Sequence, residues 1–231
     1  MNYAIPAPTL PTLAVAGRDE RFPVNRVFCV GRNYAAHARE MGKDPDREPP
    51  FFFMKPANAV VDAQRPVEIP YPPKTKNYHH EIELIVAIGK GGANIAAADA
   101  LRHVYGYAVG LDMTRRDLQL EARDKGRPWE FGKSFAQSAP IGALRRAADM
   151  GHPASAAISL AVNGKPRQSS DIAKLIWSVS ECIAYLSEYE ALEPGDLIMT
   201  GTPEGVNAVL PGDVMQGAIA GIGEIEIRVE T

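Results

Sequence analysis

The chain has 231 residues, of which 45% are hydrophobic and 23% charged, a composition typical of a soluble globular protein of one domain or two small ones. A formal net charge of −3 excludes a basic field over the whole chain, so we expect neither a nucleic acid nor an anionic membrane as partner. No apolar run approaches the 18 residues of a membrane helix, no signal peptide is recognisable, and the two cysteines form no motif, which favours a cytoplasmic setting.

The sequence predicts more strands than helices. Apolar runs rich in β-branched and aromatic residues, bounded by Gly, Pro or Asn, favour strands. In chain order, such runs occupy residues 24–31, 49–61, 82–88, 105–112, 157–168 (a hairpin turned by Asn163-Gly164) and 223–230. Amphipathic segments with capping residues favour helices over 33–41, over 115–126 and from residue 178 onward.

The helix ends are predicted from capping residues. Asn33 is the expected N-cap of the first helix, and Gly42 follows its end. Gly126 is expected to end the second helix. Ser178 and Glu181 have the spacing of a capping box at the start of the third helix.

The domain organisation is expected to be simple. Residues 1–23 are rich in proline and predict an N-terminal extension, and residues 24–231 predict the main domain. The proline-rich stretch 62–76 is the nearest feature to a boundary within that domain.

Two acidic residues stand at the start of the apolar run 82–88. Glu81 and Glu83 are two residues apart, so in a strand their side chains point to one face, roughly 6–7 Å apart. Burying two unpaired carboxylates there costs several kcal/mol, so a buried pair requires a cation. The alternative is that both are exposed and pair with Lys74 or Lys76, because exposed glutamate is the common case.

Asp112 is a candidate third ligand. It ends the predicted strand 105–112 on a face of small residues, including Gly106 and Gly110, which leaves room beside it. Three carboxylates and water suit Mg²⁺, with Mn²⁺ as a close substitute. Two adjacent histidines just upstream of Glu81 lack the spacing of a zinc site.

Other motifs are excluded. The segment "GRPWEFGKS" has Arg127 where a phosphate-binding loop needs glycine, and no complete dinucleotide fingerprint is present. No GxSxG occurs, and neither cysteine has a histidine beside it in sequence, so a serine or cysteine nucleophile is unsupported.

His37 and Glu40 are a candidate general-base pair. They are three residues apart on the predicted helix 33–41 and therefore share a face. A carboxylate that orients an imidazole is a common way to make a base near neutral pH. The alternative is an exposed polar helix face. The role of Lys133 is equally undecided at this point, because most lysines are solvated and only burial would give this one a chemical role.

Several motifs occur in the order seen in one enzyme family. They are "VGRNYAAHAREM", "FFMKP", "HHEIELIVAIG", "YGYAVGLDMTRRDLQ", "GRPWEFGKSF", "QSAPIG" and "GDLIMTGTPEGV". In this order the chain resembles the fumarylacetoacetate hydrolase superfamily, and most closely its small acylpyruvate-cleaving members, over roughly residues 24–231. The resemblance implies an α+β, mostly β fold: a mixed β-roll with short flanking helices and a lid helix, usually a homodimer.

The resemblance also implies roles for individual residues. Metal ligands to Mg²⁺ or Mn²⁺ would be Glu81, Glu83 and Asp112. Catalytic residues would be His37, Glu40 and Lys133, with His37 and Glu40 activating water. Substrate-binding residues would be Arg32, Lys55, Arg115, Arg116, Gln119, Thr200 and Thr202. The implied reaction is hydrolysis of the C–C bond of a 2,4-dioxo acid, with fumarylpyruvate, an intermediate of aromatic catabolism, as the expected substrate.

The second carboxylate of fumarylpyruvate needs a cation. Arg116 matches the family position, so Arg115 beside it, and Arg32, are the spare cations. The alternative is that Arg115 is a solvated residue of the first helical turn.

Two other functions stay open: oxaloacetate decarboxylation or another acylpyruvase activity within the superfamily, and a non-catalytic binding protein stabilised by metal.

Overall fold

The computed structural model describes residues 2–40 and 48–231. The mixed eight-stranded sheet runs in the order β4 (Phe51–Lys55), β3 (Val27–Gly31), β15 (Leu197–Met199), β8 (Ile82–Ile88), β9 (Val104–Leu111), β11 (Ala139–Ile141) and β5 (Val60–Asp62), and β12 (Arg145–Arg146) pairs with β9. The five-stranded sheet runs β14 (Lys165–Asp171), β13 (Ala157–Val162), β17 (Val214–Ile219), β18 (Gly223–Val229) and β6 (Val67–Ile69). Two smaller sheets are β10 (Thr114–Arg115), β7 (Tyr78–His79) and β16 (Ala208–Val209), and the hairpin of β1 (Thr12–Ala14) and β2 (Arg21–Pro23).

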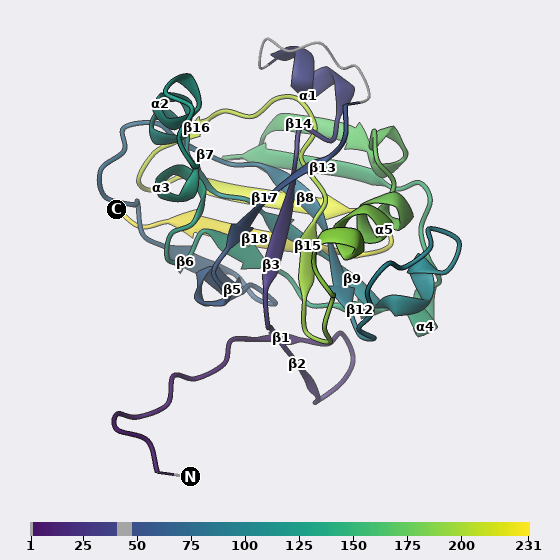
Figure 1. Cartoon of the computed structure of the whole chain (residues 1–231). Coiled ribbons are helices and arrows are strands. Elements are labelled where there is room, and N and C mark those ends of the chain that lie inside the picture. The colour runs from purple at the N-terminus through teal and green to yellow at the C-terminus, as the bar shows by residue number, and fades with distance from the viewer. Residues whose placement is uncertain (1, 41–47) are drawn as a thin grey trace.

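Helices are short and lie around these sheets (Figure 1). They are α1 (Ala35–Glu40), α2 (Arg116–Asp124), α3 (Glu130–Lys133), α4 (Ala147–Met150) and α5 (Val179–Tyr189), with 3₁₀ turns at Ala57–Ala59, Ala100–His103 and Ile172–Lys174. In Figure 1, α2 and α3 lie on the opposite side of the body from α5. The α+β, mostly β fold class predicted from sequence is confirmed.

Strand β8 is buried on both faces because it separates two hydrophobic cores. Ile82 and Leu84 point into the larger core, which also holds apolar residues of the five-stranded sheet and α5. Ile85 and Ala87 point into a second core, shared with the β1–β2 hairpin and with β3 and β15. Glu83 lies on the same side of the strand as Ile85 and Ala87. This buried face of β8 is therefore apolar at Ile85 and Ala87 and acidic at Glu83, next to the second core.

The small residues of β9 serve packing. A side chain added at Gly110 would meet Ile85 and Ile141, and one added at Gly106 would meet the backbone of Arg145. The expected close approach to β9 is therefore present. The space is filled by neighbouring side chains and backbone, however, and Asp112 lies just past the end of the strand.

Most predicted elements are present. The hairpin turns at Asn163-Gly164, both with positive φ, and the capping box of Ser178 and Glu181 is formed. Cys182 is a core residue, and burial raises the pKa of its thiol to about 12.

One predicted cap is wrong. Asn33 does not cap the first helix through its side chain. Its amide instead binds the backbone of Trp177 and Thr200, which ties the chain before α1 to two distant loops. Gly42, the expected end of that helix, lies outside the described residues.

The first 23 residues are not uniform in structure. Residues 2–10 are exposed and extend away from the body (Figure 1). Leu13 and Phe22, from the β1–β2 hairpin, are buried in the second core. Within the described part of the chain, no helix is long and apolar enough to cross a membrane.

Candidate metal and active site

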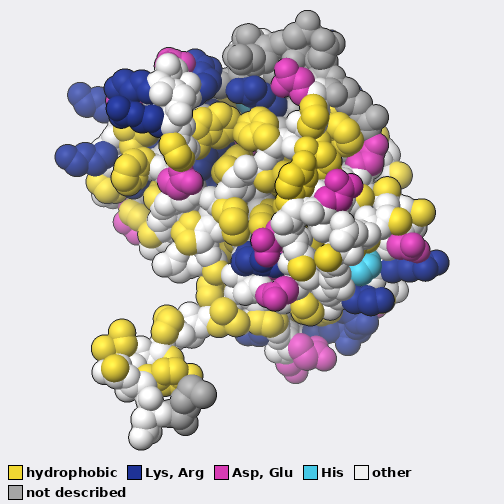
Figure 2. Space-filling model, viewed as in Figure 1, with side chains coloured by type: hydrophobic (Ala, Val, Ile, Leu, Met, Phe, Trp, Pro, Cys, Tyr) yellow, Lys and Arg dark blue, Asp and Glu magenta, His cyan; other side chains and the backbone are white. Residues whose placement is uncertain are grey.

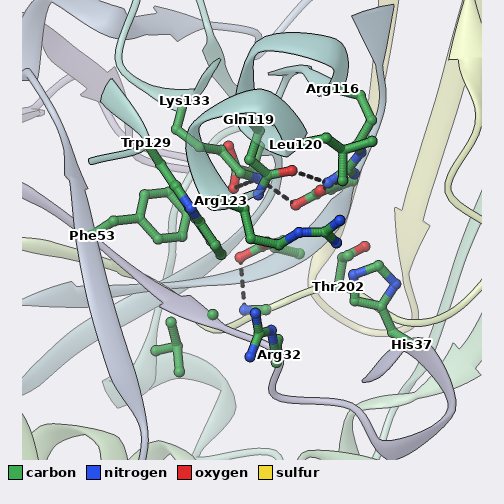
Figure 3. Close-up of a pocket in the computed structure, with 16 residues that line it drawn as sticks. Arg32, His37, Phe53, Arg116, Gln119, Leu120, Arg123, Trp129, Lys133 and Thr202 are labelled. Carbon is green, nitrogen blue, oxygen red and sulfur yellow. Dashed lines mark hydrogen bonds and ion pairs between the residues drawn. The ribbon is translucent and has the colours of Figure 1, made fainter. Parts of the chain in front are cut away.

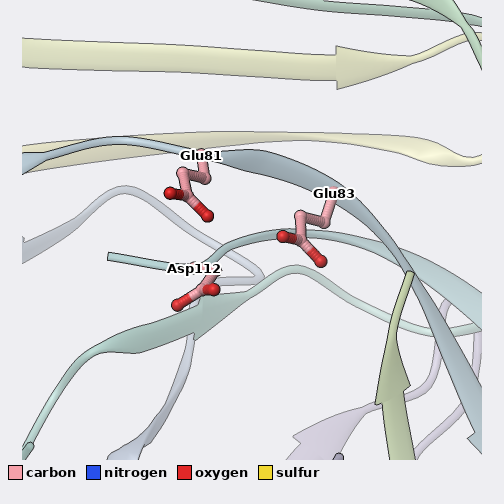
Figure 4. Close-up of side chains that lie close together, drawn as sticks. All are labelled: Glu81, Glu83 and Asp112. Atoms are coloured by element: carbon pink, nitrogen blue, oxygen red, sulfur yellow. The ribbon is translucent and has the colours of Figure 1, made fainter. Parts of the chain in front are cut away.

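Glu81, Glu83 and Asp112 form a buried acidic cluster, as Figure 4 shows. One oxygen from each can be chosen so that all lie within 4.8 Å of one another. The β8–β9 ladder produces this arrangement, because Glu83 stands opposite Gly110 and the Asp112 N–H donates to Glu81 O at 2.9 Å. The alternative of exposed glutamates paired with lysines of the 62–76 stretch is therefore wrong.

Three buried cations face the three carboxylates. Lys133 Nζ lies 2.7 Å from Glu81 Oε2 and 2.6 Å from Asp112 Oδ2. Lys55 Nζ lies 2.8 Å from Asp112 Oδ1, and Arg116 pairs with Glu81. The three cations equal the three carboxylates in number, but their contacts are with Glu81 and Asp112 and none is with Glu83 among the described residues.

The carboxylates differ in pKa. Burial alone would raise the pKa of Glu81, but Lys133 and Arg116 outweigh it and hold that pKa well below its ordinary value. Burial and the neighbouring charges of Asp112 and Glu81 raise the pKa of Glu83 well above its ordinary value. Glu83 is therefore the carboxylate that most lacks a cation.

The donor set fits a hard divalent ion. It consists of carboxylate oxygens only, the ligands that Mg²⁺ and Mn²⁺ prefer. Asp112 Oδ1 is buried and makes no hydrogen bond, although it lies close to Lys55. Glu83 Oε2 accepts a hydrogen bond from Gly201 N–H at 2.7 Å, which fixes the direction of that carboxylate.

His37 and Glu40 come together at the same pocket. His37 is 6% exposed, and its Nδ1 lies 3.3 Å from Glu40 Oε2. Burial lowers the pKa of His37 below 6.5, although Glu81 and the hydrogen bond to Glu40 act in the opposite direction. The imidazole is therefore neutral, and able to accept a proton, at neutral pH.

The pocket has a volume of about 540 Å³, open solvent at its mouth included. Figure 3 shows its lining, with α2 and α3 on one side and the β3–α1 connection on the other. Nine residues predicted from sequence line it: Arg32, His37, Glu81, Glu83, Asp112, Arg116, Gln119, Lys133 and Thr202.

Four predicted residues do not line the pocket. Glu40 contacts His37 Nδ1 and accepts a hydrogen bond from Gly205 N–H. Lys55 lies beneath Asp112, where Met113 O and Ser138 Oγ also contact its ammonium group. The Thr200 hydroxyl donates to Leu84 O at 3.0 Å, a backbone contact.

Arg115 is the fourth predicted residue that does not line the pocket. Its guanidinium lies over the ring of Phe135, 4.2 Å from the centroid, and donates to Phe131 O at 3.3 Å. Arg115 precedes α2 in the short strand β10, so the pairing of β10 with β7 sets its direction. The structure does not bring it to the site.

Sequence reasoning missed two polar residues. Arg123 lines the pocket two turns along α2 from Arg116. Arg116, Gln119 and Arg123 are spaced so that they lie on one face of the helix. That periodicity could have identified Arg123 from the sequence. Four nonpolar side chains of the wall were missed as well: Val30, Phe53, Leu120 and Trp129.

Gln168 is the second missed residue, and it holds two site segments together. Its Oε1 accepts from Ile82 N–H at 3.1 Å and lies 2.9 Å from His80 Nδ1, beside the first acidic ligand candidate. Its Nε2 donates to Thr202 Oγ1 and Pro203 O, both at 2.8 Å. No sequence signal relates Gln168 to residues more than 30 positions away.

Two glycines permit this packing. Gly201 has φ +98°, and a side chain there would meet Asn33, so its turn can present both Gly201 N–H and Thr202 to the site. A side chain at Gly132 would meet the Gln119 backbone at 2.8 Å, so only glycine lets α3 approach α2 closely enough to aim Lys133 at the carboxylates.

Comparison with known proteins agrees with this geometry. Residues 26–230 match the family described as fumarylacetoacetate (FAA) hydrolase C-terminal. Fumarylpyruvate hydrolase from a Ralstonia species is 49% identical over 191 residues, which cover 82% of this chain and 98% of that protein. Mitochondrial oxaloacetate tautomerase of Bos taurus is 41% identical over 88% of this chain and 91% of that protein.

A solved structure extends the likeness to the fold. Fumarylpyruvate hydrolase from Pseudomonas aeruginosa, crystallised in complex with Mn²⁺ and pyruvate, superposes with a TM-score of 0.95 at 59% identity, over 99% of each chain. The chain therefore belongs to the fumarylacetoacetate hydrolase family.

Proposed function

We propose that this protein is a metal-dependent hydrolase that cleaves fumarylpyruvate and water into fumarate and pyruvate. One observation carries the proposal: a buried cluster of three carboxylates and a buried His37–Glu40 pair face the same pocket. The similarity to two fumarylpyruvate hydrolases supports the choice of substrate.

The metal end of the site would bind the 2-oxo acid. Glu81, Glu83 and Asp112 would hold Mg²⁺ or Mn²⁺, and the Mn²⁺ and pyruvate in the related structure support this assignment. When bound, the ion supplies Lewis acidity to the oxygens of the 2-oxo acid. Thr202 and Gln119 line the pocket beside the carboxylates and would orient that end of the substrate.

His37 would act as general base. It takes a proton from water, whose oxygen attacks the carbonyl carbon at position 4. The C3–C4 bond then breaks, its electron pair stays on the pyruvate fragment, and fumarate is released after C3 gains a proton. Glu40 keeps the imidazole oriented through Nδ1.

Lys133 would stabilise negative charge that develops on the pyruvate fragment. Burial acts to lower its pKa, but Asp112 and Glu81 outweigh burial and raise it, so the ammonium group stays charged. Such fixed charge in a dry site is an effective stabiliser of a transition state. With a divalent ion bound, this end of the site would favour the carboxylate and the enolate oxygen of the pyruvate fragment.

Further expectations accompany this proposal. We propose a homodimer in the cytoplasm, and a division into an N-terminal extension (1–23) and a catalytic domain (24–231). The family match over residues 26–230 supports the division. A second candidate function is chemistry on oxaloacetate, favoured by the 41% identity to an oxaloacetate tautomerase.

A substrate panel tests the proposal. The kcat/KM values for fumarylpyruvate, maleylpyruvate, acetylpyruvate and oxaloacetate should be measured on Mn²⁺-loaded protein, with EDTA-treated protein as control. We expect fumarylpyruvate to be the best substrate and EDTA to abolish its cleavage. Turnover of oxaloacetate alone would favour the second candidate, and no turnover of any substrate would indicate a binding protein.

A further inference from the structure

The pocket has a second cationic end, away from the carboxylate cluster. Arg123 from α2 and Arg32 from the β3–α1 connection both line it. Neither contacts the acidic cluster through any hydrogen bond or ion pair in the described part of the chain. Figure 3 shows the Arg123 side chain extending from α2 into the pocket.

Helix geometry relates the two ends. Arg116, which pairs with Glu81, and Arg123 are seven residues apart and therefore share one face of α2. At 1.5 Å per residue their Cα atoms are separated by about 10 Å along the axis. A seven-carbon 2,4-dioxo acid with six C–C bonds spans roughly 7–8 Å between its terminal carbons. The helix face is thus long enough for one end of such a chain to lie near each arginine.

The wall between the two ends is apolar. Leu120 lies between Arg116 and Arg123 on α2, and Phe53 and Trp129 complete this part of the lining. A carbon chain with a double bond needs no hydrogen-bond partner there, and aromatic and aliphatic side chains suit it.

Arg123 retains donors for a ligand. Its side chain is 34% exposed, and its Nε and Nη2 lie 2.9 and 2.8 Å from Oδ1 of the adjacent Asp124. Among the described residues, no acceptor contacts Nη1. Because a guanidinium carries five N–H donors, it can bind a carboxylate while it keeps a contact with Asp124.

Arg32 adds a second positive charge from another element. It has φ +56°, a left-handed conformation that is uncommon for a residue with a side chain, and its guanidinium lies 5.3 Å from the centroid of the Phe51 ring. Figure 2 shows lysine and arginine side chains gathered over α2, so the approach to this end of the pocket is also positively charged.

We propose that Arg123, assisted by Arg32, binds the second carboxylate of a dicarboxylic acylpyruvate and so selects it over substrates that end in a methyl group. The proposal rests on the proposed function and adds the residue that determines specificity. Arg115, the cation favoured by the sequence, lies outside the pocket and has no part in this contact.

The test compares Arg123→Gln with Lys125→Gln. Lys125 follows α2 directly, pairs with Glu121 and does not line the pocket, so its variant controls for the loss of one positive charge nearby. In Arg123→Gln, kcat/KM for fumarylpyruvate should fall at least 10-fold, mainly through KM, whereas acetylpyruvate should change less than 2-fold. Lys125→Gln should leave both within 2-fold. A 10-fold loss corresponds to about 1.4 kcal/mol.

A binding measurement separates this proposal from the proposed function. Calorimetry on Mn²⁺-loaded protein should show that Arg123→Gln weakens fumarate at least 10-fold and leaves crotonate, which has a methyl group in place of one carboxylate, unchanged. If the wild type cleaves no acylpyruvate, the proposed function fails, and the fumarate affinities still decide the role of Arg123. Equal losses for both substrates, or equal fumarate binding by variant and wild type, would overturn the proposal.

Discussion

The inner and outer ends of the pocket are held in different ways. At the inner end, Glu83 and Asp112 are positioned by the paired strands β8 and β9, and Lys133 Nζ lies less than 3 Å from oxygens of Glu81 and Asp112. At the outer end, Arg123 and Arg32 come from a short helix and a connection, and their contacts are with exposed groups or aromatic rings. The inner end is preorganised for charge, whereas the outer end leaves donors available for a ligand. Substitutions at the inner end should therefore affect every substrate, and those at the outer end should discriminate between substrates.

Glu83→Gln should have the largest effect. The amide keeps an acceptor for Gly201 N–H but removes one anionic ligand, so kcat should fall on the order of 10³-fold for every substrate. In wild-type protein, Mn²⁺ at 100 times its Kd should add about 2.7 kcal/mol of stability, on the order of 5–10 °C in Tm for a domain of this size. The variant should lose most of that Tm shift.

The metal-free state provides a control for that variant. Removing one of three mutually repelling buried carboxylates should leave the Tm of the metal-free protein unchanged or higher. Glu121→Gln, at an exposed position on α2, should retain the whole metal-induced shift. Full activity of Glu83→Gln in trace metal would show that Glu83 is not a ligand.

His37→Ala should reduce kcat for fumarylpyruvate by about 10²–10⁴-fold, the usual contribution of a general base. The metal-induced Tm shift should persist, because His37 is not among the acidic cluster. Decarboxylation of oxaloacetate, which needs no activated water, should fall less than hydrolysis. Equal losses in both reactions would mean that His37 only shapes the pocket.

Glu40→Gln should have a smaller effect, visible in the pH profile. Since burial lowers the pKa of His37 below 6.5, the base form persists below that pH, and the acid limb of wild-type kcat/KM should lie below pH 6.5. Glu40 and Glu81 raise this pKa, and Arg116 lowers it. Removing the charge of Glu40 should therefore move the acid limb to lower pH, with a loss in kcat of about 10-fold from poorer orientation.

An acid limb that moves to higher pH would contradict this assignment. It would mean that another group, whose pKa Glu40 lowers, controls the rate. An unchanged limb would show that His37 titrates independently of Glu40.

Local patterns suggested two parts of the site, and the resemblance to the family supplied the other assignments. Alternation along β8 placed Glu83 on a buried face, and helical spacing paired His37 with Glu40. Long-range packing decided the remainder. Asn33 is a residue type that often caps helices, yet its side-chain amide donates hydrogen bonds to backbone carbonyls of loops more than 140 residues away in sequence.

Gln168 shows even more clearly that long-range contacts cannot be predicted from the local sequence. Its neighbours in sequence predict only a strand of a hairpin, and nothing local indicates that its amide is 1% exposed and joins β8 to the Thr202 turn. A buried amide of this kind is recognisable only when the two sheets are brought together. Strands and motifs are thus predictable from sequence, whereas the groups that position them are not.

Arg115→Ala should have the smallest effect and is the sharpest comparison between the sequence and the structure. The sequence predicts that Arg115 reads the distal carboxylate, with a selective loss of 10-fold or more for fumarylpyruvate when it is removed. In the structure its guanidinium lies over Phe135 and donates to Phe131 O, outside the pocket lining. We therefore expect kcat/KM to change less than 2-fold for fumarylpyruvate and for acetylpyruvate, with a loss of stability of about 0.5–1 kcal/mol from the cation–π contact. Steady-state kinetics with both substrates and urea unfolding measure the two effects. A selective loss for fumarylpyruvate in Arg115→Ala, with none in Arg123→Gln, would restore the sequence-based assignment and place the outer end of the site on the Phe135 side of α2.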